Sequence, residues 1–246
     1  MNLSQPNAKD EKKCFPCDVD SPREECGVLG ICAPGEDVSR MAFFGLFALQ
    51  HRGQEAAGIA VSDQQKLNLH KDIGLVSRVF TPQSLENLTG SLAVAHVRYS
   101  TFGSSVITNV QPFLIDTRYG TIALAHNGNL VNASQLREEL MLNGIGFSST
   151  SDTEVMTMML AGAEGSDWFE RIRCCMSRWV GAYCLVILAR DTVFAVRDPW
   201  GFRPLSLGRL PGGGHVIASE TGALHTLGWN EIREIQPGEI VQLQGE

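Results

Sequence analysis

The chain has 246 residues, a formal net charge of −7 and 43% hydrophobic residues, which suits one large domain with a sizeable core. The acidic balance argues against nucleic acid or an anionic membrane as partner, because both reward clustered Lys and Arg. No apolar run approaches the ~20 residues that span a bilayer, so we expect a small soluble substrate.

The chain opens with a polar segment, residues 1–25, that mixes lysines with acidic residues. It lacks the apolar middle of a signal peptide and the acid-poor character of a transit peptide, so we expect a leader that precedes the folded domain. The seven cysteines are an odd number in a chain too long to need disulfide staples, which indicates a reducing, cytoplasmic setting. Cys14 and Cys17 have C-x-x-C spacing, but no second pair follows at zinc-site spacing, and we predict no metal site.

After this leader, apolar periodicity predicts more strands than helices. Strands are expected at 27–33, 58–61, 92–97, 121–125, 183–189, 193–196, 205–207, 216–219 and 240–243, and helices at 38–49, 132–143, 155–161 and 166–179. Residues Ser151–Glu154 have the pattern of a capping box at the start of the third helix. Because the strands come in runs rather than in strict alternation with helices, we predict an α+β fold with two packed sheets.

Short polar clusters border several of these elements. Cys26 precedes the first strand, and the strands 92–97 and 121–125 end in Arg98–Thr101 and His126–Asn129. A cysteine attacks as its thiolate and needs a base or a positive environment at neutral pH. The histidines at positions 51, 96 and 126 are bases by type, and the α-amine of Cys26 would be another if the leader were cut immediately before it. The residues alone do not choose among these bases.

Each cluster also has a simpler interpretation. An isolated Asn127-Gly128 is typical of a tight turn. A lone Arg98 most often forms a surface salt bridge, Gly53 suits a helix stop, and an acid such as Asp152 in a first helical turn is stabilised by the helix dipole without any ligand. Together, and in this order along the chain, the clusters indicate a common function more strongly than any one of them does alone.

As an ordered set, the clusters resemble the class II glutamine amidotransferases. The similar segments are Cys26–Val28, Gln50–Glu55, His96–Thr101, Ala125–Gly128, Ser151-Asp152 and Arg197–Pro199. Within that class, the set is most similar to the amidophosphoribosyltransferases of purine synthesis, and the resemblance runs from about Glu24 to the C-terminus. It implies the N-terminal nucleophile hydrolase fold, a four-layer αββα sandwich, and it implies that the base is the α-amine of a processed Cys26.

The resemblance also implies the catalytic roles. Cys26 would attack the side-chain amide of glutamine and release ammonia, leaving a γ-glutamyl thioester that water hydrolyses. Asn127 and Gly128 would form the oxyanion hole, a side-chain amide and a backbone N–H aimed at the developing charge. His96 and His126 are left without a base role and are expected to be structural hydrogen-bonding residues.

The resemblance further implies how the substrate is held. Arg98 would grip the α-carboxylate of glutamine with its planar guanidinium, and Asp152 would receive the α-ammonium group. Arg52 and Gly53 would hold the thiol and the glutamine pocket. Tyr99 and Thr101 would begin a loop that closes over glutamine, with Gly103 as its hinge.

Other expectations concern what lies outside this chain. Members of the resembled family continue into a phosphoribosyltransferase domain that binds phosphoribosyl pyrophosphate and magnesium, some also hold an iron–sulfur cluster there, and they form homo-oligomers. No acidic, strand-borne loop of that kind is found before Glu246. We therefore expect residues 26–246 to be a glutaminase domain without a cofactor of its own. The alternatives are the glutaminase half of a glucosamine-phosphate or asparagine type synthase, and an unprocessed, non-catalytic glutamine-binding module.

Overall fold

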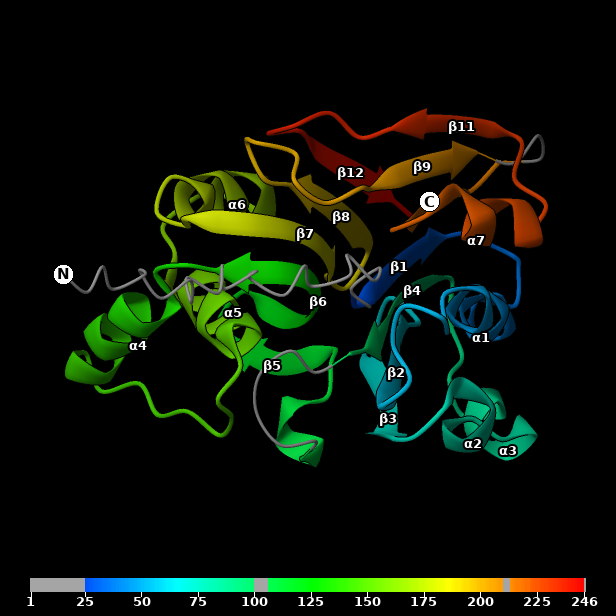
Figure 1. Cartoon of the computed structure of the whole chain (residues 1–246), viewed down its shortest axis with the longest axis horizontal. Coiled ribbons are helices and arrows are strands. Elements are labelled where there is room, and N and C mark those ends of the chain that lie inside the picture. The colour runs from blue at the N-terminus through cyan, green and yellow to red at the C-terminus, as the bar shows by residue number, and fades with distance from the viewer. Residues whose placement is uncertain (1–24, 100–105, 210–212, 246) are drawn as a thin grey trace, which may run out of the picture.

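A computed structural model describes residues 25–99, 106–209 and 213–245 and contains two antiparallel sheets packed face to face. Helices cover both outer faces, with α4, α5 and α6 on one side of the sheets and α1, α2, α3 and α7 on the other (Figure 1). The predicted four-layer αββα sandwich is therefore confirmed. Among the described helices, none is long and apolar enough to cross a membrane.

Neighbouring strands are antiparallel throughout the two sheets. The larger sheet has the order β11-β9-β10-β1-β4-β2-β3 and the smaller one β12-β8-β7-β6-β5. The strands of the larger sheet are β1 Gly27–Cys32, β2 Ala56–Ser62, β3 Leu67–Ile73, β4 Leu92–Arg98, β9 Ser206–Arg209, β10 His215–Ala218 and β11 Glu231–Glu234. Those of the smaller sheet are β5 Phe113–Thr117, β6 Gly120–Leu130, β7 Gly181–Leu188, β8 Thr192–Arg197 and β12 Ile240–Gln244.

The helices fall into two groups, one for each sheet. The larger sheet carries α1 Val38–Ala48, α2 Val76–Val79, α3 Pro82–Glu86 and α7 Thr221–Thr226. The smaller sheet carries α4 Ala133–Leu142, α5 Asp152–Gly162 and α6 Trp168–Met176, and a 3₁₀ turn η1 spans Ile107–Asn109.

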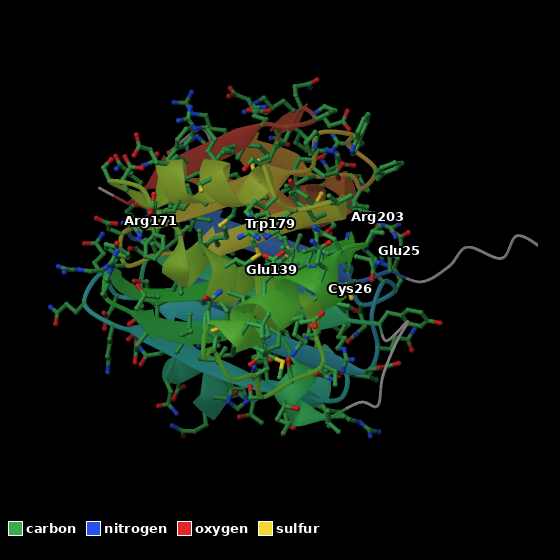
Figure 2. All side chains as sticks on the ribbon, turned by 90° about the vertical axis from the view of Figure 1, so that its left-hand side faces the viewer. Glu25, Cys26, Glu139, Arg171, Trp179 and Arg203 are labelled. Carbon is green, nitrogen blue, oxygen red and sulfur yellow. The ribbon has the colours of Figure 1, made fainter. Side chains whose placement is uncertain are left out.

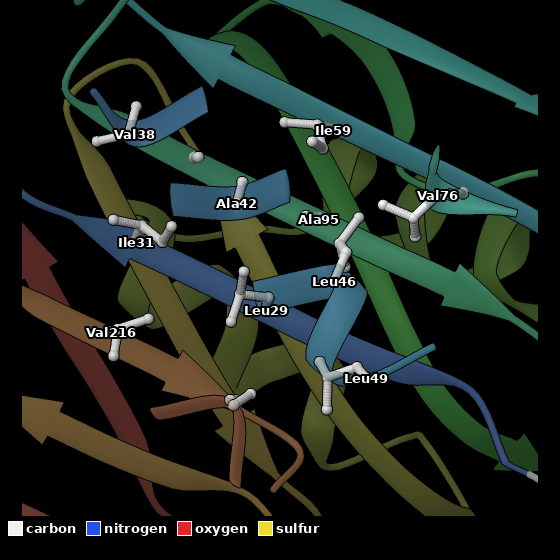
Figure 3. Packing of buried hydrophobic residues seen from close by; sticks show 14 of the residues in the cluster. Leu29, Ile31, Val38, Ala42, Leu46, Leu49, Ile59, Val76, Ala95 and Val216 are labelled. Carbon is white, nitrogen blue, oxygen red and sulfur yellow. The ribbon is translucent and has the colours of Figure 1, made fainter. Parts of the chain in front are cut away.

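The period-two alternation of strand side chains divides the core into three apolar layers. In β1, Leu29 and Ile31 are fully buried beneath α1 (Figure 3), whereas Val28 faces the layer between the sheets. The same alternation holds in β4 and in β6, so that the even-numbered residues of β4 and the odd-numbered residues of β6 face that middle layer. When this alternation is continued to the strand ends, Cys26, Arg98 and Asn127 all face the same region between the sheets.

The structure differs from the sequence prediction mainly at the sheet edges. The strands β3, β5 and β11 were not predicted, and each is an edge strand with half-exposed, mixed polar and apolar residues rather than an apolar run. The short helices α2, α3 and α7 were also missed. The predicted strand 121–125 is too short, because β6 continues to Leu130, which pairs with Gly181 of β7. Asn127-Gly128 therefore lies inside a strand and not in a turn.

The prediction of a capping box is right for Ser151 and wrong for Glu154. The Ser151 hydroxyl accepts a hydrogen bond from the Thr153 N–H at the start of α5, as expected of an N-cap. The Glu154 carboxylate instead accepts four hydrogen bonds from the backbone N–H groups and hydroxyls of Ser148 and Ser149. The Glu154 carboxylate therefore binds the loop before α5, although the sequence pattern assigned it to the helix cap.

Candidate active site

A cavity of about 330 Å³ opens where the two sheets meet α5, and side chains from both sheets line it. Five of the residues predicted from sequence are on its wall: Cys26, Arg98, Tyr99, Gly128 and Asp152. A second cavity, of about 260 Å³ between α1 and α3, is lined by none of the predicted site residues. The tertiary structure therefore gathers the dispersed motifs at one end of the sandwich.

The Cys26 thiol lies against the backbone at the end of β4. Its Sγ is 3.4 Å from the carbonyl oxygen of Tyr99 and 3.5 Å from the Tyr99 nitrogen. Burial raises the pKa of the Cys26 thiol, as does the Asp152 carboxylate, and these effects exceed the lowering by the Tyr99 backbone and by Arg98 and Arg52. With residue 25 attached, the Cys26 nitrogen is an amide. The thiol is thus positioned but not activated.

Arg98 brings a buried positive charge to the cavity wall. The residue is only 7% exposed, and its Nη1 has no hydrogen-bond partner in the described part of the chain. A buried guanidinium nitrogen without a partner is costly, because its desolvation is not offset by a hydrogen bond. The arrangement is suited to an anionic ligand.

Asn127 and Gly128 lie side by side in β6, across from β7. The Asn127 side chain is 2% exposed, and its Nδ2 finds no partner among the described residues. Gly128 has φ of +148°, and a Cβ there would lie 2.0 Å from the Ala182 carbonyl oxygen. Only glycine fits at that position, because a side chain would collide with the backbone of β7.

Asp152 is the first residue of α5 and faces the cavity as a carboxylate. Its Oδ2 accepts a hydrogen bond of 3.0 Å from the Leu130 N–H, and its Oδ1 lies 3.6 Å from Nδ1 of His126. Burial would raise the pKa of Asp152, but the charge of His126 and the hydrogen bonds of Asp152 to its neighbours lower it to about 2. The cavity therefore contains a negative group as well as a positive one.

Arg52 and Gly53 support the site from behind and do not line the cavity. Arg52 donates from Nε to the Cys26 carbonyl oxygen at 3.1 Å, and its other nitrogens bind the carboxylates of Glu25 and Glu220. A Cβ at Gly53 would lie 2.5 Å from the carbonyl carbon of Arg98, so the turn packs directly on that backbone. The predicted contacts of Thr101 and the hinge at Gly103 lie outside the described residues.

Two histidines that the sequence offered as bases are poorly placed for that task. His51 is exposed and binds both carboxylate oxygens of Glu220 at 3.1 Å, outside the cavity. Burial, together with the charge of His126, lowers the pKa of His96 to about 3, which makes it a weak base at neutral pH.

Several residues at the site were missed from the sequence. Glu25 pairs with Arg203 as well as with Arg52, and Figure 2 shows Arg203, Glu25 and Cys26 gathered at one side of the molecule. Gln111 and Asn109 line the cavity from the segment before β5. No local pattern marks them, because their importance comes from contacts with residues far along the chain.

Comparison with known proteins connects this geometry to a family. Residues 96–226, just over half of the chain, match the glutamine amidotransferase domain family. The chain belongs to this family. Among curated relatives, this glutamine amidotransferase domain is 51% identical over 229 residues to an amidophosphoribosyltransferase of Synechococcus elongatus, covering 91% of the chain and 46% of the relative. It is 45% identical over 236 residues to an amidophosphoribosyltransferase of Mycobacterium tuberculosis, covering 93% and 45%.

Solved structures agree with both the fold and the resemblance. The glutamine phosphoribosylpyrophosphate amidotransferase of B. subtilis, complexed with ADP and GMP, matches with a TM-score of 0.84 and 40% identity, covering 89% of the amidotransferase domain and 47% of that chain. A predicted glutamine amidotransferase from Pseudomonas aeruginosa matches at 15% identity with a TM-score of 0.52, which supports the fold alone. The domain spans about half the length of the curated relatives it matches. The predicted resemblance to amidophosphoribosyltransferases is confirmed, and the other class II synthases are not favoured.

Proposed function

We propose that the domain hydrolyses the side-chain amide of glutamine through Cys26, and that the ammonia serves to form phosphoribosylamine from phosphoribosyl pyrophosphate in purine synthesis. The observation that carries the hydrolysis is the meeting, in one cavity, of the Cys26 thiol, the carboxylate of Asp152 and the guanidinium of Arg98, whose Nη1 has no partner among the described residues. A positive group and a negative group beside a nucleophile match the α-carboxylate and α-ammonium of an amino acid that carries a reactive side chain.

The proposed chemistry uses a covalent thioester. The Cys26 thiolate attacks the amide carbon of glutamine, and the resulting oxyanion is held by Nδ2 of Asn127 and the backbone N–H of Gly128. The carbon–nitrogen bond then breaks, and the departing nitrogen takes the proton that the base removed from the thiol. Water hydrolyses the γ-glutamyl thioester to glutamate. The unsatisfied, buried Nδ2 of Asn127 supports this role, since an oxyanion would give that group its missing partner.

Release of residues 1–25 belongs to the same proposal. A free α-amine at Cys26, with a pKa of ~7.7–8.0, would be a base matched to neutral pH, whereas the amide nitrogen has no basicity. Because burial raises the pKa of the Cys26 thiol, the thiol needs such a base, which supports a dormant precursor. The proposal assigns Arg52 and Gly53 to support of the thiol and of Arg98, and Tyr99 and Thr101 to the closing loop.

The amidotransferase domain would act with a phosphoribosyltransferase domain. The relatives' names and their twofold greater length support such a partner, which would bind phosphoribosyl pyrophosphate and magnesium. No cofactor is assigned to residues 26–246, because thiol, amine and amide donors suffice for hydrolysis. The proposal also includes a cytoplasmic location and a homo-oligomeric state for the protein.

Two measurements test the enzymatic function. A chain that begins at Cys26 is expected to release glutamate from L-glutamine, and Cys26→Ala should abolish this release while Cys174→Ala, at an exposed thiol, retains it. An electrophilic glutamine analogue should add once, at Cys26, in an intact-mass spectrum. A correctly cut chain that binds glutamine but releases no glutamate would refute the enzymatic function and leave a non-catalytic binding module.

A further inference from the structure

The side chain of Gln111 has one possible orientation, which fixes the hydrogens around Asp152. The backbone N–H of His126 can only donate, and it lies 2.6 Å from Oε1 of Gln111. The other end of the amide, Nε2, must then donate, and it lies 3.0 Å from the Thr153 hydroxyl oxygen. The Thr153 oxygen therefore accepts from Gln111.

The position of the Thr153 proton follows from the same reasoning. Its hydroxyl lies 3.5 Å from Oδ1 of Asp152 and 3.3 Å from Nδ1 of His126. The Asp152 carboxylate can only accept and bears a full negative charge, whereas Nδ1 accepts only in the tautomer that has no proton there, so Oδ1 is the stronger acceptor for the hydroxyl proton. Nδ1 of His126 then faces two oxygens, those of Thr153 and Asp152, with no hydrogen between them except its own.

The tautomer that satisfies both oxygens has its proton on Nδ1 of His126. The opposite tautomer would place a nitrogen lone pair 3.6 Å from the carboxylate oxygen of Asp152, where two electron-rich atoms repel. The His126 side chain is 1% exposed, and its Nε2 has no partner within the described ranges, so the ring's fixed contacts are on the Asp152 side. The second oxygen of Asp152 is fixed by the Leu130 N–H.

We propose that His126 is the positioning residue for recognition of the substrate α-ammonium group, because its Nδ1–H holds the Asp152 carboxylate toward the cavity. The inference rests on the proposed glutaminase function. It gives a specific task to His126, which the sequence analysis expected to be a structural hydrogen-bonding residue. Thr153 and Gln111 complete the arrangement by directing their hydrogens so that only the protonated Nδ1 fits.

The enzymatic test compares L-glutamine, a substrate with an α-amine, with glutarate, an inhibitor that lacks the amine. In a chain that begins at Cys26, His126→Leu removes the donor, while His126→Asn keeps an N–H near the position of Nδ1. His126→Leu should raise KM for L-glutamine roughly tenfold or more, since a displaced carboxylate weakens a charge-assisted contact. The inhibition constant of glutarate, which lacks the amine, should stay within about twofold of its original value. His126→Asn should recover most of the lost affinity, and His225→Leu, at an exposed histidine, should change neither constant.

Equal losses for L-glutamine and glutarate would overturn the inference, because they would mean that the ring only supports the fold. A His126→Leu chain with an unchanged KM would overturn it as well. If His126→Leu does not fold, failure of the folded His126→Asn variant to retain selectivity for the amine would have the same meaning.

Nuclear magnetic resonance tests the hydrogen assignment without turnover. In a chain labelled with ¹⁵N-histidine, long-range ¹H–¹⁵N correlations should show a proton on Nδ1 of His126, and Asp152→Asn should shift that nitrogen. A bare Nδ1 would refute the inference even in an active enzyme. A protonated Nδ1 in a chain that cannot hydrolyse glutamine would support the assignment and refute the proposed function, which separates the two failures.

Discussion

Two arginines on the wall of one cavity should respond in opposite ways to replacement by Met. Arg98 is buried, and its Nη1 lacks a partner in the described residues. Arg137 also lines the cavity, but it donates to the carbonyl oxygens of Ser149 and Ser151 at 3.0 and 2.8 Å, and its guanidinium lies 4.2 Å from the centre of the Phe147 ring. The proposed function assigns the first guanidinium to the substrate carboxylate, whereas the second binds the backbone of a loop.

The magnitudes follow from these contacts. A hydrogen bond to a charged group contributes ~1.5–3 kcal/mol, so loss of a two-pronged contact with the substrate carboxylate should cost about 3 kcal/mol or more. That free energy corresponds to a rise in KM of roughly a hundredfold. Removing the buried charge of Arg98, whose Nη1 has no partner among the described residues, should leave the free energy of unfolding unchanged or increase it. Arg137→Met should instead lower the free energy of unfolding by ~1–3 kcal/mol, because two backbone carbonyls lose their donors.

Glutamate release and urea unfolding measure the two effects in the same preparations. Arg98→Met should show a high KM for glutamine and undiminished stability, and Arg137→Met should show reduced stability. Arg40→Met, at an exposed arginine that does not line this cavity, serves as the control for loss of a positive charge. The reasoning would be refuted if Arg98→Met lost as much stability as Arg137→Met while KM stayed at its original value.

Three further predictions concern the same cavity. Asn127→Ala should lower kcat for glutamine hydrolysis roughly 10²–10³-fold with little change in KM, because it removes an oxyanion donor; an unchanged kcat would contradict that role. Burial would raise the pKa of Asp152, but the charge of His126 and neighbouring hydrogen bonds lower it to about 2 in the folded protein. A carboxyl with a lowered folded pKa stabilises the fold above its unfolded pKa of ~3.9, and that stability is lost as the pH falls toward the folded value. Urea unfolding between pH 4 and pH 2 should therefore show a steeper loss in the native chain than in Asp152→Asn, and parallel curves would argue against the lowered pKa. Since burial raises the pKa of Cys26 in the leader-bearing chain, iodoacetamide at neutral pH should modify the exposed Cys174 first, as peptide mass mapping would record; equal rates would mean that the thiol of Cys26 is already activated.

Much of the architecture was predictable because strongly periodic segments pack as their periodicity indicates. The buried strands β1, β4, β7 and β8 and the helices α1, α4, α5 and α6 were all expected from the sequence. The edge strands β3, β5 and β11 were missed because exposed and polar side chains interrupt any apolar run in them, whereas the edge strand β12 was expected at 240–243.

Among the site residues, too, those in a local motif were predictable and the others were not. Cys26, Arg98, Asn127 and Asp152 were found because each belongs to a short motif in a familiar order. Residues that act through contacts with distant segments carried no such signal. Gln111, for example, reaches His126 and Thr153, which are 15 and 42 positions away.

The sequence by itself determined which chemistry the chain can support, since a thiol, a guanidinium, an amide and a carboxylate are properties of residue types. The strand alternation that it also encodes determined that Cys26, Arg98 and Asn127 face the space between the sheets. Only the tertiary structure decided what surrounds each of these groups. The lack of a partner for Nη1 of Arg98 among the described residues and the proton on Nδ1 of His126 both depend on which atoms lie nearby after folding. Those contacts join elements that the chain separates by tens of residues, and no local pattern records them.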